Sequence, residues 1–332
     1  MVKFSDGKKK HLKALSNAQG VIAAAAMDQR GSLKKSLAKE KGVADDQITD
    51  AMMSEFKAIV SKVLTPHASA ILLDPEWGLP AAKARAKNAG LILSYEETGY
   101  DQSGPGRLPR LLRNWTVRDH VAVGANAVKI LLYYSPFDDK KVNEFKHAWV
   151  ERIGVECAFH DIPYFLEFVG YDPKGGDEKG AAFAKQKPDI VLGSIKEFTQ
   201  DKYYVDVLKV EVPINPAFVA GGRGCKGESV YSKQEALDHF KRSSDAATRP
   251  FIYLSAGVDD DVFRENLEYA IDAKTRWNGV LCGRATWKQG IPVYAKEGAA
   301  AFEAWLQDRG VKNIQALNAL LAKANSWESF GG

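Results

Sequence analysis

The sequence contains little cysteine, and the little it has forms no recognisable pattern. Its 332 residues include only Cys157, Cys225 and Cys282, and no two of them are spaced as C-x-x-C. An odd number of widely separated thiols makes neither a disulfide framework nor a cysteine metal site. Disulfide-rich secreted domains are therefore excluded, and we expect a protein of a reducing compartment, the cytoplasm.

Histidine is also scarce and is poorly placed for metal binding. The six histidines are His11, His67, His120, His147, His160 and His239. No pair is spaced as H-x-H or H-x-x-x-H, and none lies at the end of an apolar run. A magnesium site from Asp28, Asp74 and Glu96 is the remaining option, although carboxylates serve equally well as hydroxyl-binding or ion-paired groups. We predict neither a metal nor any other cofactor.

Long apolar runs and a large charge excess are both absent. No uncharged apolar stretch approaches the roughly 18 residues that a membrane helix needs. The Lys-rich residues 1–15 lack the hydrophobic segment of a secretory signal. A net charge of +4 without a long basic block argues against nucleic-acid binding. With 45% hydrophobic and 27% charged residues, the composition is that of an ordinary globular protein.

Short apolar runs recur along the whole chain, and each ends in a polar or glycine-containing segment. Nearly uniform apolar character over four to seven residues is typical of strands buried on both faces. Eight such runs are present: Val21–Met27, Ala70–Leu73, Leu91–Tyr95, Ala127–Tyr133, Tyr164–Phe168, Val205–Val210, Phe251–Ser255 and Gly279–Cys282.

Longer segments between these runs have the 3.6-residue periodicity of amphipathic helices. They are Asp46–Leu64, Asp138–Ile153, Ser232–Arg242, Asp259–Ala273, Lys296–Arg309 and Gln315–Lys323. Eight strands alternating with crossover helices predict a closed (β/α)8 TIM barrel of the α/β class. An open doubly wound sheet is the second possibility. The sequence lacks the G-x-G-x-x-G motif that a dinucleotide-binding sheet of this kind would contain. We expect one domain over residues 1–332, with an N-terminal helical extension and a C-terminal helix.

In such a barrel, functional groups lie at the C-terminal ends of the strands, which are rich in charge here. Lys129 and Lys209 stand out because each interrupts an apolar strand. A buried lysine extends its amine to water, is ion-paired or is functional. The fourth and sixth strands fill shared layers, so we expect the two lysines to face each other in the mouth. Burial and a neighbouring cation both lower the pKa of an amine, which is what Schiff-base chemistry requires.

Glu167 lies on the strand between the two lysines, in the segment F-L-E-F. One interpretation makes it a salt-bridge partner of either lysine. The other makes it a general acid and base beside an iminium ion, and both roles can hold at different steps.

The last two strands end in glycine-containing turns, which is the usual phosphate site of such barrels. Gly257 and Gly283 permit close approach of backbone N–H groups, and Arg284 adds a charge-assisted contact. Turns that merely close the barrel are the alternative. The glycine-rich segments 172–180 and 221–227 are either loops of the active face or flexible surface.

Together these motifs resemble those of the class I tagatose-1,6-bisphosphate aldolases. The segment Val205–Pro213 (VDVLKVEVP) is similar to the Schiff-base strand of that family. Further similar segments are Met27–Gly31 (MDQRG), Leu72–Glu76 (LLDPE), Glu97–Asp101 (ETGYD), Lys129–Tyr134 (KILLYY), Tyr253–Val258 (YLSAGV) and Leu281–Trp287 (LCGRATW). The similarity runs from about residue 10 to about residue 327.

The resemblance implies a metal-independent barrel that cleaves a ketohexose 1,6-bisphosphate, of the tagatose or fructose type. The products would be dihydroxyacetone phosphate and glyceraldehyde 3-phosphate. Lys209 would be the Schiff-base lysine and Glu167 the acid and base. The other implied or candidate substrate contacts are Asp28 and Lys129 on the reacting hydroxyls, Gln29 and Glu96 in the wall, and Ser255, Gly257, Gly283 and Arg284 at the C1 phosphate.

The far end of the substrate is where the resemblance is weakest. The segments Asp101–Arg107 and Ala220–Ser229 match the family less well. Arg30 and Arg107 are the candidates for the far phosphate. Two alternatives stay open: a Schiff-base aldolase for another ketose 1-phosphate, such as a 6-sulfo sugar, and a non-catalytic barrel that senses sugar phosphates. The sequence is compatible with a homo-oligomer and does not specify the C4 epimer.

Overall fold

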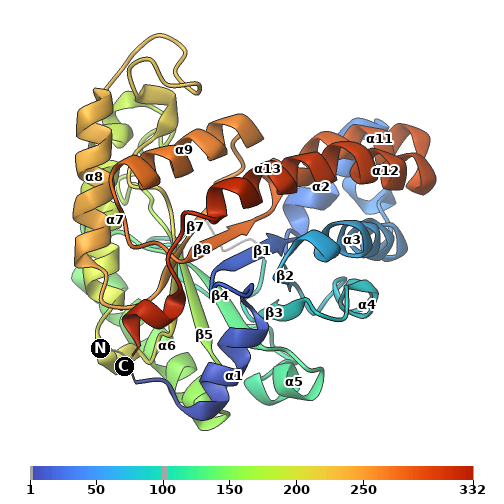
Figure 1. Cartoon of the computed structure of the whole chain (residues 1–332), viewed down its shortest axis with the longest axis horizontal. Helices are drawn as coiled ribbons and strands as arrows, with labels where there is room; N and C mark the ends of the chain where they lie inside the picture. The colour runs from blue at the N-terminus through green and yellow to red at the C-terminus, as the bar shows by residue number, and fades with distance from the viewer. Residues whose placement is uncertain (1–2, 99–103, 332) are drawn as a thin grey trace.

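Eight parallel strands form a closed barrel in chain order in a computed structural model that describes residues 3–98 and 104–331 (Figure 1). The strands are β1 (Ile22–Ala26), β2 (Ala70–Leu73), β3 (Gly90–Ser94), β4 (Ala127–Tyr133), β5 (Tyr164–Val169), β6 (Val207–Val210), β7 (Phe251–Leu254) and β8 (Gly279–Cys282). The barrel closes by pairing β8 with β1. The predicted fold class is confirmed, and every predicted strand matches within two residues at each end. Part of the predicted motif Glu97–Asp101 and of the segment Asp101–Arg107 lies outside the described residues.

Helices surround the strands (Figure 1). They are α1 (Asp6–Ala14), α2 (Gly31–Lys41), α3 (Asp50–Leu64), α4 (Leu79–Ala84), α5 (Val117–Ala122), α6 (Lys140–Phe159), α7 (Ala181–Phe198), α8 (Lys233–Ala246), α9 (Asp260–Asp272), α10 (Arg284–Trp287), α11 (Ile291–Glu297), α12 (Ala299–Trp305) and α13 (Val311–Leu321). The periodic segments predicted α3, α6, α8 and α9. They did not predict α7, which contains Pro188, a residue that normally interrupts helices.

The C-terminal helices differ from the prediction in their boundaries. The periodicity predicts one helix over residues 296–309, but the chain breaks at Gly298, whose φ is +86°, between α11 and α12. From α12 the helix runs through a π-helical turn, Leu306–Gly310, into α13. The predicted helix Gln315–Lys323 therefore begins earlier, and α13 packs against α3 and α9 on the barrel exterior.

Alternate residues of each strand point into the barrel, and this alternation positions the polar groups. The strand residues of the interior core are Ile22, Ala24, Ala26, Ala70, Leu72, Ile92, Ala127, Phe165, Val207, Ile252 and Leu281. Two residues beyond Ala127, Phe165 and Val207, the inward positions are occupied by Lys129, Glu167 and Lys209. The charged groups thus form the next layer above an apolar interior.

Helix α1, which is the predicted N-terminal helical extension, closes the N-terminal end of the barrel. Leu12 of α1, together with Phe4 and Trp327, joins the interior apolar cluster. Lys8 of α1 forms a buried ion pair with Asp206, 2.7 Å away, at the start of β6. The opposite end therefore remains as the open face of the barrel.

None of the helices in the described ranges 3–98 and 104–331 is both long enough and apolar enough to cross a membrane.

Candidate active site

A cavity of about 700 Å³ opens at the C-terminal ends of the strands. It is lined by β1 and β4 to β8, by the loops after β1, β3 and β5 to β8, and by the starts of α2, α7 and α10. Among the residues predicted from the sequence, the lining includes Asp28, Gln29, Arg30, Glu96, Lys129, Glu167, Lys209, Ser255, Gly257, Gly283 and Arg284. The structure therefore collects in one cavity groups that are up to about 250 residues apart in the chain.

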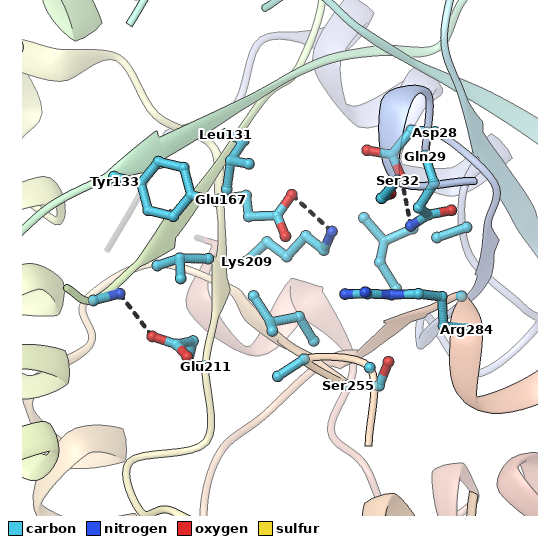
Figure 2. Close-up of a pocket in the computed structure, with 18 of the residues that line it drawn as sticks. Asp28, Gln29, Ser32, Leu131, Tyr133, Glu167, Lys209, Glu211, Ser255 and Arg284 are labelled. Atoms are coloured by element: carbon cyan, nitrogen blue, oxygen red, sulfur yellow. Dashed lines mark hydrogen bonds and ion pairs between the residues drawn. The ribbon is translucent and has the colours of Figure 1, made fainter. Parts of the chain in front are cut away.

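Glu167 lies between the two lysines. One carboxylate oxygen, Oε2, is 2.7 Å from Lys129 Nζ and 2.8 Å from Lys209 Nζ. Glu167 and Lys209 are partners in the register of β5 and β6, so their side chains stand next to each other on the inner face. Figure 2 shows the Glu167 carboxylate directed at the Lys209 amine. A proton can therefore pass directly between these two groups.

Lys129 is surrounded by carboxylates. Its Nζ lies 2.9 Å from Asp28 Oδ2 and 3.0 Å from Glu96 Oε1, in addition to the contact with Glu167. Burial alone would lower the pKa of Lys129, but Asp28, Glu167 and Glu96 together raise it well above its usual value. Lys129 is consequently an ammonium ion at neutral pH.

The carboxylates around Lys129 respond differently to burial. Burial would raise the pKa of Asp28 and of Glu167, but the ammonium groups of Lys129 and Lys209 hold both values below the usual range. For Glu96 the burial effect dominates and raises the pKa, against the opposing charges of Lys129 and Arg30. Asp28 and Glu167 are therefore ionised in the unliganded site.

Lys209 has a simpler environment than Lys129. Within the described part of the chain, Glu167 is the one carboxylate that forms an ion pair with it. A proton transferred from Lys209 to Glu167 would leave a neutral amine beside a carboxylic acid. Such a pair supplies both the nucleophile and the acid that Schiff-base formation needs.

The loop after β1 carries three of the predicted residues. Gln29 Nε2 donates to Asp28 Oδ1 at 3.2 Å, which orients both side chains at the cavity wall. Arg30 is buried, and its guanidinium donates to the Glu96 backbone carbonyl at 2.7 Å and lies 3.4 Å from Glu76 Oε2. Arg30 thus ties the β1 loop to the end of β3.

The ends of β7 and β8 meet at Arg284. Gly257 has a φ of +77°, and a Cβ there would lie 2.8 Å from the Arg284 Cζ, so a side chain would displace the guanidinium. Arg284 is exposed, and it forms no ion pair with the residues that the structure describes. Figure 2 shows its guanidinium reaching into the cavity, with Ser255 nearby. This end of the cavity can accept an anion.

Arg107, the second candidate for the far phosphate, does not belong to the cavity lining. Its guanidinium lies 2.6 Å from Glu178 Oε1 and stacks 5.0 Å from the Tyr133 ring and 4.8 Å from the Tyr171 ring. It acts in this conformation as a support for the cavity wall at Tyr133.

Two buried ion pairs, one in the cavity lining and one outside it, were not predicted from the sequence. Lys187 of α7 lies 3.0 Å from Glu211, which also accepts a hydrogen bond from Gly170 N at 2.7 Å. Lys57 of α3 is completely buried against Asp74. Two features of the sequence could have revealed these pairs. Glu211 lies two residues after Lys209, and Lys57 lies on the apolar stripe of its helix.

The carboxylates of the magnesium alternative are not gathered at one point. Asp28 and Glu96 contact Lys129, whereas Asp74 contacts Lys57. Over residues 3–98 and 104–331, no cluster of three His, Cys, Asp or Glu side chains is arranged to hold a metal ion. The charge at the centre of the mouth is an ammonium group.

Comparison with known proteins identifies close relatives. The DeoC/LacD aldolase family matches residues 22–289. Tagatose 1,6-diphosphate aldolase 2 of Enterococcus faecalis is 48% identical over 330 residues, which cover 99% of this chain and 98% of the relative. Tagatose 1,6-diphosphate aldolase of Listeria monocytogenes is 47% identical over 333 residues, covering 100% of this chain and 97% of the relative.

The barrel is also similar to solved aldolase structures. Fructose-bisphosphate aldolase of Plasmodium falciparum superposes with a TM-score of 0.69 over 98% of both chains, at 14% sequence identity. An archaeal fructose 1,6-bisphosphate aldolase has a TM-score of 0.58 over 95% of this chain and 98% of its own, again at 14% identity. At such identities the likeness concerns the fold. The full-length sequence relatives and the family match show that this chain belongs to the DeoC/LacD aldolase family.

Proposed function

We propose that this protein is a class I ketose-bisphosphate aldolase, which cleaves tagatose or fructose 1,6-bisphosphate through a Schiff base on Lys209. The names of the full-length relatives support the substrate class. The observation that carries the chemistry is the difference between the two lysines at Glu167. Among the described residues, Lys129 contacts three carboxylates, whereas Lys209 contacts one, that of Glu167.

This difference supports Lys209 as the nucleophile. A raised pKa keeps Lys129 protonated, so it has no lone pair with which to attack a carbonyl. Lys209 can pass its proton to Glu167 and then attack the C2 ketone of the substrate. The resulting carbinolamine loses water as Glu167 donates the proton to the departing oxygen. The product is an iminium ion that links C2 to Lys209.

The iminium ion then acts as an electron sink for carbon–carbon cleavage. The Glu167 carboxylate takes the proton of the C4 hydroxyl, and the C3–C4 bond breaks as its electrons move toward the iminium nitrogen. Glyceraldehyde 3-phosphate leaves, and an enamine remains on Lys209. Protonation at C3 and hydrolysis release dihydroxyacetone phosphate. Lys129 and Asp28, which are 2.9 Å apart, orient the hydroxyls of the reacting carbons.

The C1 phosphate binds at the ends of β7 and β8. Arg284 provides the charge, and backbone N–H groups near Ser255, Gly257 and Gly283 approach the phosphate oxygens. Placing this anion at Arg284 brings the C2 ketone toward Lys209, because both side chains reach into the same cavity (Figure 2). Gln29 and Glu96 complete the wall around the hydroxyls.

The far phosphate requires a cationic group elsewhere in the cavity. Arg30 lines the cavity but is engaged with Glu96 and Glu76, and Arg107 is engaged with Glu178. The exposed lysines Lys35 and Lys179 also line it. We assign the far phosphate to these cationic groups, with the buried Arg30 as the first candidate. The buried Lys187 also lines the cavity, where it is paired with Glu211.

The test combines turnover with covalent trapping. Release of dihydroxyacetone phosphate is measured side by side from tagatose 1,6-bisphosphate, fructose 1,6-bisphosphate and a 6-sulfo ketose 1-phosphate. The protein is then incubated with dihydroxyacetone phosphate and borohydride, and the modified peptide is identified by mass spectrometry. We expect turnover of the bisphosphates and one added fragment, on Lys209, that is absent from Lys209→Met.

Other outcomes would redirect the proposal. A fragment on Lys129 would reverse the roles of the two lysines. Turnover of the sulfo sugar alone would favour the related aldolase. Sugar-phosphate binding with neither turnover nor trapping would indicate a sensor.

A further inference from the structure

Lys57 is a buried cation that the reaction above does not use. It lies in the middle of α3, on the outside of the barrel, and its side chain is 0% exposed. Its Nζ donates to the backbone carbonyl of Met27 at 2.9 Å, to that of Gln29 at 2.8 Å, and to the Asp74 carboxylate. An ammonium group has three protons, and each of them has an acceptor here.

The partner carboxylate is equally well held. Asp74 follows β2 and is also 0% exposed. Its other oxygen, Oδ1, accepts a hydrogen bond from Trp77 N at 2.8 Å. The pair is therefore electrically balanced inside the protein, and it connects the end of β2 to α3 and to the loop after β1.

The two carbonyls that Lys57 binds stand on either side of Asp28. The Met27 carbonyl belongs to the peptide bond before Asp28, and the Gln29 carbonyl belongs to the one that joins Gln29 to Arg30. Both must point toward α3 for one ammonium group to reach them. With the backbone held on that side, the Asp28 carboxylate is directed into the mouth, where it lies 2.9 Å from Lys129 Nζ.

We propose that the Lys57–Asp74 pair is a positioning device for carbon–carbon cleavage, which sets the backbone of Asp28 and Gln29 so that their side chains meet the substrate hydroxyls. The proposal rests on the proposed function for the roles of those two side chains. Neither Lys57 nor Asp74 belongs to the cavity lining, so the pair acts through the loop rather than on the substrate. Glu167 is on β5 and Lys209 is on β6, and neither residue has a hydrogen bond or ion pair with Lys57 or Asp74.

The proposal predicts a separation between two steps. Schiff-base formation depends on Lys209 and Glu167 and should persist without the pair. Cleavage depends on the orientation of the hydroxyls at Asp28 and Gln29 and should be slower. Misplacement of a catalytic contact by about 1 Å costs about a hundredfold in rate, so we expect a decrease in kcat of about tenfold to a hundredfold.

The test variant is Lys57→Met with Asp74→Asn. Removing both charges leaves no isolated buried ion, and Asn keeps an oxygen for Trp77 N. The matched control is Lys8→Met with Asp206→Asn. This pair is also buried, its Asp206 also accepts a backbone hydrogen bond, from Tyr164 N at 2.8 Å, and it lies at the closed end of the barrel.

The measurement is kcat for bisphosphate cleavage per trapped site. A trapped site is a lysine that becomes linked to dihydroxyacetone phosphate on borohydride reduction. The Lys57/Asp74 variant should trap as the wild type does and cleave about tenfold to a hundredfold more slowly per trapped site. The Lys8/Asp206 variant should lose thermal stability but keep its kcat per trapped site.

Three results would overturn the proposal. They are an unchanged kcat per trapped site in the Lys57/Asp74 variant, an equal loss in the Lys8/Asp206 control, or a loss of trapping that parallels the loss of cleavage. If the double variant does not fold, Lys57→Met alone serves, since it removes both carbonyl bonds and leaves Asp74, which keeps its hydrogen bond from Trp77 N. A slower kcat per trapped site is then expected, and an unchanged one contradicts the proposal. A wild-type protein that neither traps nor cleaves would refute the aldolase function instead.

Discussion

At the scale of single residues, the neighbours of a charged group decide its chemistry. Lys129 and Lys209 both interrupt apolar strands, and in the sequence only the resemblance of Val205–Pro213 to a Schiff-base strand separates their roles. In the structure Lys129 contacts Asp28, Glu96 and Glu167, whereas Lys209 contacts Glu167. The carboxylates raise the pKa of Lys129 and so keep its amine protonated. In the proposed mechanism the nucleophile is therefore Lys209.

Arg284 provides a residue-level test of phosphate binding. Replacing it with Ala removes a charge-assisted contact worth roughly 2–4 kcal/mol, so kcat/KM for a bisphosphate should fall about 30-fold to 1000-fold. A substrate analogue without the C1 phosphate should lose much less. Steady-state kinetics with both substrates give the answer. Equal losses for the two would mean that Arg284 is structural.

His120 gives a residue-level prediction for stability. Its side chain is 0% exposed, and burial lowers its pKa to about 4, against the opposing hydrogen bond with the Thr116 backbone. In the unfolded chain a histidine titrates near 6.5. Between these values the unfolded state binds more protons, so the free energy of unfolding falls as pH decreases from about 6.5 to 4. The difference amounts to about 3 kcal/mol.

The comparison with His120→Gln isolates this contribution, because Gln does not titrate. Urea unfolding of both proteins at pH 7 and pH 4 should show the wild type losing about 3 kcal/mol more than the variant. If both lose the same amount, His120 does not resist protonation.

At the scale of elements, strand alternation carries functional side chains into the barrel. Because side chains alternate across a strand, the residue two positions beyond an inward apolar side chain also points inward, as Glu167 does beyond Phe165. This rule could be applied to the sequence directly. Helix α3 was also predictable, although its start moves to Asp50, because Thr49 caps it by accepting a hydrogen bond from Met52 N.

The start of β8 lies very close to β1, where the barrel closes. Gly279 has a φ of +135°, and a Cβ there would lie 2.0 Å from the Ile22 carbonyl oxygen of β1. Gly279→Ala should therefore lower the free energy of unfolding by at least about 3 kcal/mol.

Gly31→Ala is the matched control in the same denaturation experiment. No atom lies within 4 Å of a Cβ at Gly31, so the change should be within about 0.5 kcal/mol. A Gly279 variant as stable as this control would show that β1 and β8 can move apart to make room for a side chain without a loss of free energy of unfolding.

At the scale of the whole molecule, the closed barrel brings distant residues into one network. Asp28, Glu96, Glu167 and Lys209 come from four different strands or their loops and are all linked directly or indirectly to Lys129. The centre of this network is an ammonium group. The electron sink of the proposed reaction is the iminium on Lys209.

Cleavage should therefore be independent of divalent metal. After prolonged dialysis against EDTA, kcat and KM for the bisphosphate should be unchanged, because no step needs a Lewis acid. The control is a metal-dependent aldolase treated in parallel, which should lose its activity. Loss of activity here that zinc or magnesium restores would contradict the Schiff-base mechanism.

The sequence by itself determined the barrel and the inward charged layer. Strand alternation and helix periodicity are local patterns, which can be recognised without knowing how the elements pack. It therefore pointed to Lys129, Glu167 and Lys209. Only the tertiary structure decided which carboxylates contact which lysine, that Arg30 is engaged with Glu96, and that Lys57 reaches the β1 loop from outside. Those contacts join loops and helices far apart in the chain, and their geometry follows from how elements pack, which no local pattern encodes.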